Sequence, residues 1–346
     1  MYPYSFIVII TELYNIAKKN TEGQVPKMKE NLRYYLGKLL ELILTLALVS
    51  LLTFGAFSII PGDTASAILG PDASEAQLEA MRDRLGLNDP LHERYLDWIG
   101  GVFTGDLGES TFYNVPVSEL IATRLPVTFG LSLLALIWVL AISIPSSILS
   151  SRHPGRLLDQ IFSIIGHITF AIPPFVLSLL SILIASSVFG IFTVGRYVAP
   201  EVSFTQYVSC LMLPAFCISL PKIAMTFKLL RSAILEEKSR DYVRTSRGHG
   251  LSEFKIMFTH IVPNSSVSLM TAISIVLSDL LGGSLIVEQV FNLPGLGRLL
   301  LSGINHRDFP LLSGIVLYLA FMMVILYFLC DIISSAIDPR MRLHRR

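Results

Sequence analysis

Charged residues are scarce in this chain. Asp, Glu, Lys and Arg make up 15% of its 346 residues, against about 25% in an ordinary soluble domain. A water-soluble fold could not cover the remaining apolar surface with polar groups, so a lipid bilayer is the expected solvent. The formal net charge of +1 gives no basic field for phosphates, which argues against a nucleic-acid-binding protein.

Cysteines are few, and a nucleotide-binding loop is absent. Cys210, Cys217 and Cys330 all fall in apolar stretches, which favours packed thiols over a disulfide framework or a metal site. The sequence contains no G-x-x-x-x-G-K-[ST] segment, the loop that cradles nucleotide phosphates. It therefore predicts no catalytic residue, no metal and no cofactor in this chain.

Six apolar stretches are long enough to span a bilayer as helices, which takes about 20 residues. They are residues 42–60, 125–151, 161–188, 205–230, 265–287 and 309–330, the last continuing to 337. Pro173-Pro174 is expected to kink the third stretch. Lys222 and Lys228 interrupt the fourth, and their side chains are expected to snorkel toward the membrane surface. The pattern predicts an all-α polytopic membrane protein with six transmembrane helices.

The distribution of Lys and Arg orients these spans. Segments on one side of the membrane carry 20 of these residues and segments on the other carry 7, which places both termini in the cytoplasm. The predicted organisation is a cytoplasmic segment 1–38, a first transmembrane helix 39–60, an external segment 61–124, a core of five spans 125–338 and a cytoplasmic tail 339–346. Residues 1–27 do not show the pattern of a signal peptide, so none is expected there. They are either an interfacial segment or lie before a translation start at Met28, which is slightly favoured.

The external segment begins with a helix signature. Ser74 and Gln77 form a capping box, in which each side chain bonds the other's backbone N–H. Leu78 and Met81 follow at helical spacing, so an amphipathic helix is expected there. The glycines and proline that come later favour a compact lid; they are Gly100, Gly101, Gly105, Gly108 and Pro116.

The internal segment 232–263 is charged and helical in pattern. It is expected to form two short helices separated at Gly248–Gly250, with Ser252 as the second N-cap and Pro263 as its end. Composition alone leaves two interpretations, a solvated connector or a docking element, and favours the connector.

Several motifs in this chain resemble those of one known family. Residues 241–251 (DYVRTSRGHGL), followed by Pro263, are similar to the signature loop of bacterial ABC-importer permeases, closest to the dipeptide/oligopeptide/nickel class. In place of the Glu-Ala-Ala of the general loop, this chain has Arg244-Thr245-Ser246. Further matches, in the expected order over about residues 30–343, are Pro61-Gly62-Asp63, Gly105-Asp106-Leu107-Gly108, Val287-Glu288-Gln289-Val290-Phe291, Pro294-Gly295-Leu296-Gly297-Arg298 and Asp338-Pro339-Arg340.

The resemblance implies an ABC-importer permease core that forms half of a pore in the bacterial inner membrane. A second homologous permease would complete a heterodimer, two ABC ATPase subunits would bind below, and an extracytoplasmic solute-binding protein would deliver substrate. Peptides are the favoured substrate, and nickel or another small solute is the alternative. The residues expected to contact the ATPase are Asp241, Tyr242, Val243, Arg244, Thr245, Ser246, Gly250 and Leu251. An apolar side (Tyr242, Val243) and a cationic side (Arg240, Arg244, Arg247) would suit a socket, and Gly248 and Gly250 would permit the turn.

Asp279 is the one acid deep in a predicted span. Charges at such depth usually face a cavity or a partner. It is therefore a candidate for the translocation pathway, together with Gly282 and Gly283. The alternative is a hydrogen-bonded packing residue where helices approach closely. His167 in the third span is expected to make a helix–helix hydrogen bond.

The sequence disfavours two functions of other classes. Gly130-Leu131-Ser132-Leu133 with His167 fits an intramembrane serine protease. The serine is expected near the external end of its span and the histidine near the internal end of the next, so this function is disfavoured. A secondary transporter would need inverted repeats and more ionisable groups at mid-membrane depth, and neither is found in the sequence.

Overall fold

The computed structural model describes residues 28–337 except 60–68, 71–72, 85, 87, 188–194 and 196. Within these residues the regular structure is helical. Five helices are long and apolar enough to cross a membrane: α2 (Met28–Ile59), α6 (Val117–Arg152), α9 (Phe204–Lys238), α13 (Ser266–Val290) and α15 (Phe309–Ile337). The all-α membrane fold is confirmed. The helices extend beyond the apolar stretches, so α6 begins at Val117 within the predicted external segment.

The third apolar stretch is not one helix. It consists of α7 (Leu157–Ala171) and α8 (Pro174–Ser187), which are bent by 104°. Ile172 between them is extended, with φ −91° and ψ 125°, because a residue before proline is pushed out of the helical region. The predicted kink at Pro173-Pro174 is confirmed, and it is sharp enough that six spans result only if the pair counts as one.

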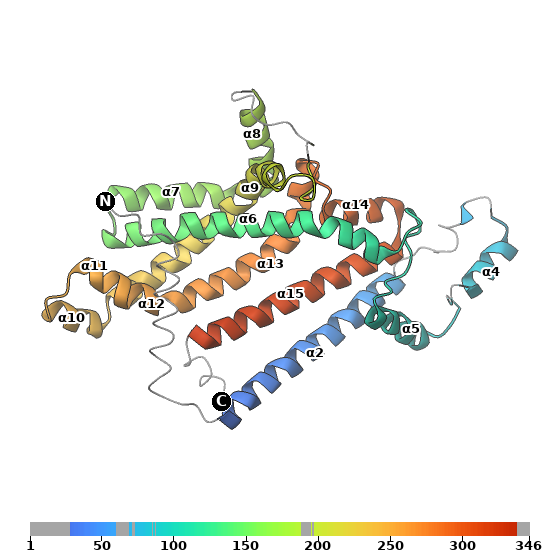
Figure 1. Ribbon diagram of the computed structural model, residues 1–346, viewed down its shortest axis with the longest axis horizontal. Helices are drawn as coiled ribbons and strands as arrows, with labels where there is room; N and C mark the ends of the chain where they lie inside the picture. Colours follow the sequence, from blue (N-terminus) through green and yellow to red (C-terminus); the bar gives the residue numbers. More distant parts are fainter. Residues whose placement is uncertain are drawn as a thin grey trace.

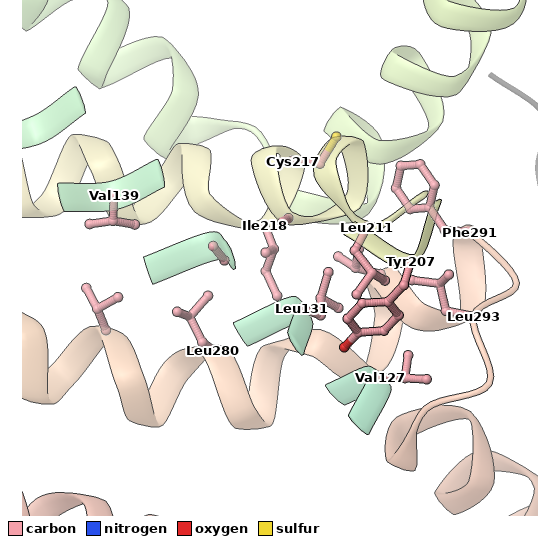
Figure 2. Packing of buried hydrophobic residues seen from close by; sticks show 14 residues of the cluster. Val127, Leu131, Val139, Tyr207, Leu211, Cys217, Ile218, Leu280, Phe291 and Leu293 are labelled. Carbon is pink, nitrogen blue, oxygen red and sulfur yellow. The ribbon is translucent and has the colours of Figure 1, made fainter. Parts of the chain in front are cut away.

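The core lies between α6, α9 and α13 (Figure 1). Leu131, Leu211, Ile218 and Leu280 pack there and are almost fully buried (Figure 2). The Tyr207 hydroxyl crosses from α9 and donates to the Pro126 carbonyl at 2.6 Å. A β-carbon on Gly130 would lie 1.8 Å from that hydroxyl oxygen. Gly130 therefore serves helix packing.

The segment between α2 and α6 contains two helices. The Ser74–Gln77 capping box at the start of α4 (Glu75–Arg84) is confirmed, with 2.9 Å from Ser74 N to Gln77 Oε1 and 3.4 Å from Gln77 N to Ser74 Oγ. The prediction missed α5 (Leu91–Thr104), because Gly100 and Gly101 lie inside it. Helix α5 packs on α2, where the Tyr95 hydroxyl lies 2.8 Å from Ser50 Oγ and its ring contacts Phe54 edge-on.

The connection before α6 is fastened to the start of α15. Asp308 is fully buried and accepts hydrogen bonds from the Ser110 hydroxyl, from Phe112 N at 3.2 Å and from Leu311 N at 3.2 Å. The last bond caps α15. A single carboxylate thus joins two connections that are almost 200 residues apart in the chain.

A second buried carboxylate fixes α14 (Leu296–His306) to the end of α13. Glu288 is fully buried and accepts from the Thr128 hydroxyl at 2.7 Å, from Gly297 N at 2.8 Å and from Arg298 N at 3.4 Å. Negative charge at a helix N-terminus is favourable because the free N–H groups point at it. A β-carbon on Gly295 would lie 2.3 Å from Glu288 Cδ, which accounts for one glycine of the Pro294–Gly297 motif.

Gly297→Ala is expected to destabilise the protein. The new β-carbon would lie 2.5 Å from Leu285 Cα, a backbone atom that cannot move aside cheaply, so we expect a loss of about 1–3 kcal/mol. Thermal unfolding in detergent measures it. Gly55→Ala in α2 is the matched control because its β-carbon would meet nothing within 4 Å. Equal midpoints for the two variants would contradict the close approach.

Candidate coupling segment and mid-membrane ion pair

The segment between α9 and α13 forms a compact helical unit at one end of the molecule (Figure 1). Helix α10 (Asp241–Gly248) follows α9 after a short turn, and α11 (Glu253–Ile256) begins at Ser252, whose hydroxyl accepts from Lys255 N at 3.3 Å. The break between the two helices and the N-cap are as predicted.

Pro263 does not end the second helix, and that prediction is wrong. The chain continues from α11 through a π-helical turn (Met257–Ile261) and α12 (Val262–Asn264) directly to α13. Pro263 is the second residue of α12 and lies inside this continuous helical run. It lacks the backbone N–H that would bond to the preceding turn, which here is π-helical. Helix α11 is therefore connected to α13 by almost continuous helix.

Val243 anchors α10 to the rest of the chain. It is fully buried in a cluster with Ile148 of α6, Ile234 of α9, and Ile256 and Ile261 of the following helices. The predicted apolar side of α10 therefore faces the chain's own helices, which corrects the expectation that it fills a partner's socket. Leu251, half-buried, packs against the same cluster.

Tyr242 is the polar counterpart of this anchor. Its hydroxyl donates to Glu237 Oε2 at 2.6 Å and accepts from Asn264 Nδ2 at 3.1 Å. It thus links the end of α9 to the residues just before α13. Burial, and then the bond to Glu237, raise the pKa of Tyr242, so the hydroxyl keeps the proton that it donates. Ser246 bonds the Tyr242 carbonyl at 2.8 Å.

The outer face of α10 presents Asp241, Arg244 and Thr245 to solvent. The Arg244 side chain is 78% exposed, and its nearest acid, Asp241, lies 3.9 Å away. The expected cationic side is smaller than predicted because the other two arginines are paired within the chain. Arg240 bonds Glu236 at 3.1 Å, and Arg247 bonds Glu253 at 2.6 Å.

The Arg247–Glu253 pair closes the turn between α10 and α11. Its hydrogen bonds hold the pKa of Glu253 below its usual range and raise that of Arg247. Gly250 in this turn has φ +78°, a left-handed conformation that favours glycine. Gly248 ends α10 and has no positive φ. Of the two expected turn glycines, only Gly250 meets the conformational need.

The same end of the bundle holds a buried ion pair that the sequence did not predict. Asp159 in the first turn of α7 accepts two bonds from Arg231 of α9, each 2.7 Å long. Lys238 at the end of α9 donates to the Ser151 carbonyl at 3.0 Å, which covers a free carbonyl at the end of α6. In the sequence, the only sign of this pair is that Asp159 and Arg231 have opposite charges and lie near the ends of apolar stretches. Only the topology showed which of them meet.

Asp279 pairs with Lys222 halfway along α13 and α9. Lys222 Nζ lies 2.5 Å from Asp279 Oδ2, and the two side chains are 19% and 48% exposed. Lys222 therefore does not extend to the membrane surface, which corrects the prediction. Lys228 is exposed, and its snorkelling stays a prediction.

The two glycines near Asp279 differ. Gly283 is exposed, and a β-carbon there would meet nothing within 4 Å. A β-carbon on Gly282 would contact Met323 of α15 at 3.4 Å. Lys222, Asp279 and Gly283 are therefore defined as the mid-membrane face. Gly282 serves packing against α15.

Ser132 and His167 give no support to a protease. Ser132 Oγ is buried and has no hydrogen-bond partner among the described residues. His167 is exposed, so the expected interhelical hydrogen bond is not seen in the described part of the chain. The described residues also contain no group of three or more His, Cys, Asp or Glu side chains that could hold a metal ion.

Comparison with known proteins gives consistent matches. Residues 143–343 match the family described as binding-protein-dependent transport system inner membrane component, and residues 31–132 match its N-terminal region. The chain is 37% identical over 311 residues to a peptide transport system permease protein of Brucella abortus (strain 2308), covering 89% of this chain and 98% of that protein. It is 34% identical over 316 residues to a glutathione transport system permease protein of Salmonella typhimurium, covering 90% and 99%.

The fold also has a solved counterpart. An inward-facing structure of the MetNI methionine ABC transporter aligns with a TM-score of 0.52 at 20% identity, covering 63% of this chain and 96% of that one. At this identity the likeness concerns the fold alone.

Val243→Ala is expected to loosen the coupling segment. Removing two buried methyl groups costs the transfer free energy plus that of a cavity, together about 1–3 kcal/mol. Limited proteolysis of the 239–252 region and thermal unfolding measure the effect. Thr245→Ala on the exposed face of the same helix is the control. If both variants are cleaved at the wild-type rate, α10 is not anchored by this side chain.

Proposed function

This chain belongs to the inner-membrane component family of binding-protein-dependent transport systems, and on that premise we propose that it forms half of a peptide pathway and couples it to ATPase subunits. As a family member it is the permease component of an ABC importer and a multi-pass protein of the bacterial inner membrane. Its relatives are permease subunits, so the chemical step of ATP hydrolysis is assigned to its partners.

The proposed substrates are di- and oligopeptides. The relatives are named for peptide, oligopeptide and glutathione transport. The mid-membrane face supports the same class, because it presents a cation beside an anion. A peptide with free termini carries both charges, whereas a divalent cation would meet the Lys222 ammonium beside the carboxylate. Nickel or another small solute is therefore the second choice.

Asp279, Lys222 and Gly283 are proposed to line the translocation pathway. Ionised side chains exposed halfway along two transmembrane helices are too costly to face lipid. They have to face either water or a partner subunit, and in a half-pore the surface toward the second permease is the pathway. Gly282 is proposed to support this face through its packing against α15.

The coupling mechanism starts at the exposed face of α10. Asp241, Arg244 and Thr245 are proposed to contact the ATPase, with Gly250 shaping the adjoining turn. Tyr242, Val243, Ser246 and Leu251 are proposed to transmit the motion, because they hold α10 against the chain's own helices.

One observation supports this proposal above all. The Tyr242 hydroxyl bonds both Glu237 of α9 and Asn264 just before α13. These two helices also carry Lys222 and Asp279. A displacement of α10 would therefore act on both members of the mid-membrane ion pair.

The remaining partners follow from the same architecture. A second homologous permease is proposed to face the Lys222–Asp279 pair as a heterodimer. An extracytoplasmic solute-binding protein is proposed to bind at the end of the molecule that carries α5 and α14 (Figure 1). Both termini are proposed to be cytoplasmic, on the same side as α10.

Co-purification from mild detergent tests the proposed assembly. The wild-type chain is expected to recover an ABC ATPase and a second permease. Arg244→Glu should reduce ATPase recovery several-fold and leave the second permease bound, because this exposed side chain makes no buried contact within the chain. Lys255→Glu, at an exposed position of α11, is the matched charge reversal and should behave as wild type. Gly250→Leu, strained by its positive φ, should couple poorly even where ATPase still binds.

Recovery of the chain alone would contradict the importer assembly. The detergent must first be shown to preserve a related complex. Unchanged ATPase recovery with Arg244→Glu would remove α10 from the proposed contact and leave the family membership intact.

A double-mutant cycle tests the mid-membrane pair. Lys222→Met and Asp279→Asn are each expected to reduce peptide uptake by the reconstituted complex, because each leaves a charge at mid-membrane depth without its partner. The double variant should recover part of the loss, with a coupling of about 0.5–3 kcal/mol. Uptake is normalised to the amount of co-purified ATPase. Losses that add without coupling would show that the pair does not act as a unit.

A further inference from the structure

Helix α5 packs against α2 near the end of α2 that is farther from α10 (Figure 1). The contact comes from one turn of α5. The Tyr95 hydroxyl lies 2.8 Å from Ser50 Oγ, and the Trp98 ring contacts Phe54 with 5.7 Å between the ring centroids. No residue of α5 is buried. Much of its surface is therefore left for something other than the described part of this chain.

The contact lies inside the apolar run of α2. The residues between Glu41 and Asp63 carry no charge in the sequence. A bilayer span takes about 20 residues, so all of this run is needed to cross the membrane. Ser50 and Phe54 both lie near the middle of the run. The Tyr95 side chain, which contacts both residues, therefore reaches the hydrocarbon region.

A second apolar stripe of α5 lies beside the one that contacts α2. Leu96, Ile99 and Phe103 follow at i, i+3 and i+7, so they share one face of the helix. They are each one to five residues beyond Tyr95 and Trp98, which places the two stripes next to each other. Phe103 is 86% exposed and Leu96 is 62% exposed. The second stripe is therefore open, although it adjoins a contact at hydrocarbon depth.

The opposite side of α5 is polar and not basic. Glu93 and Asp97 lie there and are exposed, and Arg94 is half-exposed. His92, in the first turn, is the one polar residue on the apolar side. Interfacial helices with a basic polar face are attracted to anionic lipids. With two acids against one arginine, α5 has no such attraction, so its apolar stripe has to supply the contact.

The depth of the open stripe favours lipid over a soluble partner. On α2, Leu48, Leu51 and Leu52 surround the level of the contact, and each is more than half exposed. The apolar surface of α5 thus continues that of a transmembrane helix. A water-soluble protein does not enter hydrocarbon, whereas acyl chains meet both surfaces at once. Trp and Tyr are also the residues enriched where a membrane meets water, and α5 carries one of each on its inner stripe.

We propose that α5 is inserted sideways into one leaflet of the bilayer. Leu96 and Phe103 would lie among the acyl chains, and Glu93 and Asp97 would point to the headgroups and water. Zwitterionic phospholipid is sufficient for this contact. The insertion would hold the connection between α2 and α6 at the membrane. The inference rests on α2 crossing the bilayer and is independent of the proposed substrate and coupling.

Photo-crosslinking identifies what covers the open stripe. The variant Phe103→p-benzoylphenylalanine is made in the full-length chain, purified with whatever subunits co-purify, and placed in vesicles of choline phospholipid. Because Phe103 is 86% exposed, folding should not depend on it. After irradiation, mass spectrometry is expected to find phospholipid attached to this variant several-fold more often than to Asp97→p-benzoylphenylalanine. The yield should stay the same when the vesicles also contain anionic glycerol phospholipid.

The Asp97 variant is the matched control, since it carries the same probe on the polar side of the same helix. Leu96→p-benzoylphenylalanine should behave like the Phe103 variant and replaces it if that variant fails to fold. Attachment of the Phe103 probe to another subunit would overturn the proposal and assign the stripe to a protein interface. Equal lipid attachment at positions 97 and 103, or attachment only in the anionic vesicles, would also overturn it. None of these results bears on peptide uptake or ATPase recovery, which are measured separately.

Discussion

A charged side chain inside a bilayer is tolerated only with a protein partner or a water-filled neighbour, and this cost organises the molecule. Three ion pairs reduce this cost here, and each joins two different helices. Lys38 of α2 meets Asp331 of α15, Asp159 of α7 meets Arg231 of α9, and Lys222 of α9 meets Asp279 of α13. These pairs help to determine which helices are neighbours. Apolar contacts alone discriminate poorly between helices, because all of the helix surfaces are similarly apolar.

Exposure separates the roles of these pairs. The Asp159 side chain is only 6% exposed and makes two bonds to Arg231, as a permanent fastening should. The Asp279 side chain is 48% exposed, and one of its oxygens is bonded to Lys222. A buried, doubly bonded pair resists separation, whereas an exposed one exchanges partners at lower cost. The contrast is consistent with a fixed frame at the α10 end of the bundle and a more easily rearranged pair at the mid-membrane face.

Local features of this structure could be predicted from the sequence, and distant contacts could not. The Ser74 capping box, the Ser252 N-cap and the Pro173-Pro174 break depend on neighbouring residues, so pattern alone located them. The direction of Val243 depends on where α6 and α9 end in space, and the pattern of residues along α10 carries no information about those ends. The helix that contains Gly100 and Gly101 was missed for a similar reason. Glycine usually marks a turn, but Gly101 lies within a helix, where a β-carbon would lie 2.9 Å from the Asp106 carbonyl oxygen.

The family motifs gain a physical reason once the contacts are known. Gly295 and Gly297 are small because Glu288 and Leu285 occupy the space where their β-carbons would be, and Glu288 is acidic because it caps α14. Gly250 is glycine because of its positive φ. At one end of the bundle, Glu288 and Asp308 are fully buried and multiply bonded. At the other end, Arg244 is open to solvent on a helix whose inner side is fastened to α9 and α13. This arrangement suits the proposed coupling: with one end of the bundle held rigidly, a displacement proposed to start at α10 would bend the helices between the two ends instead of moving the whole molecule.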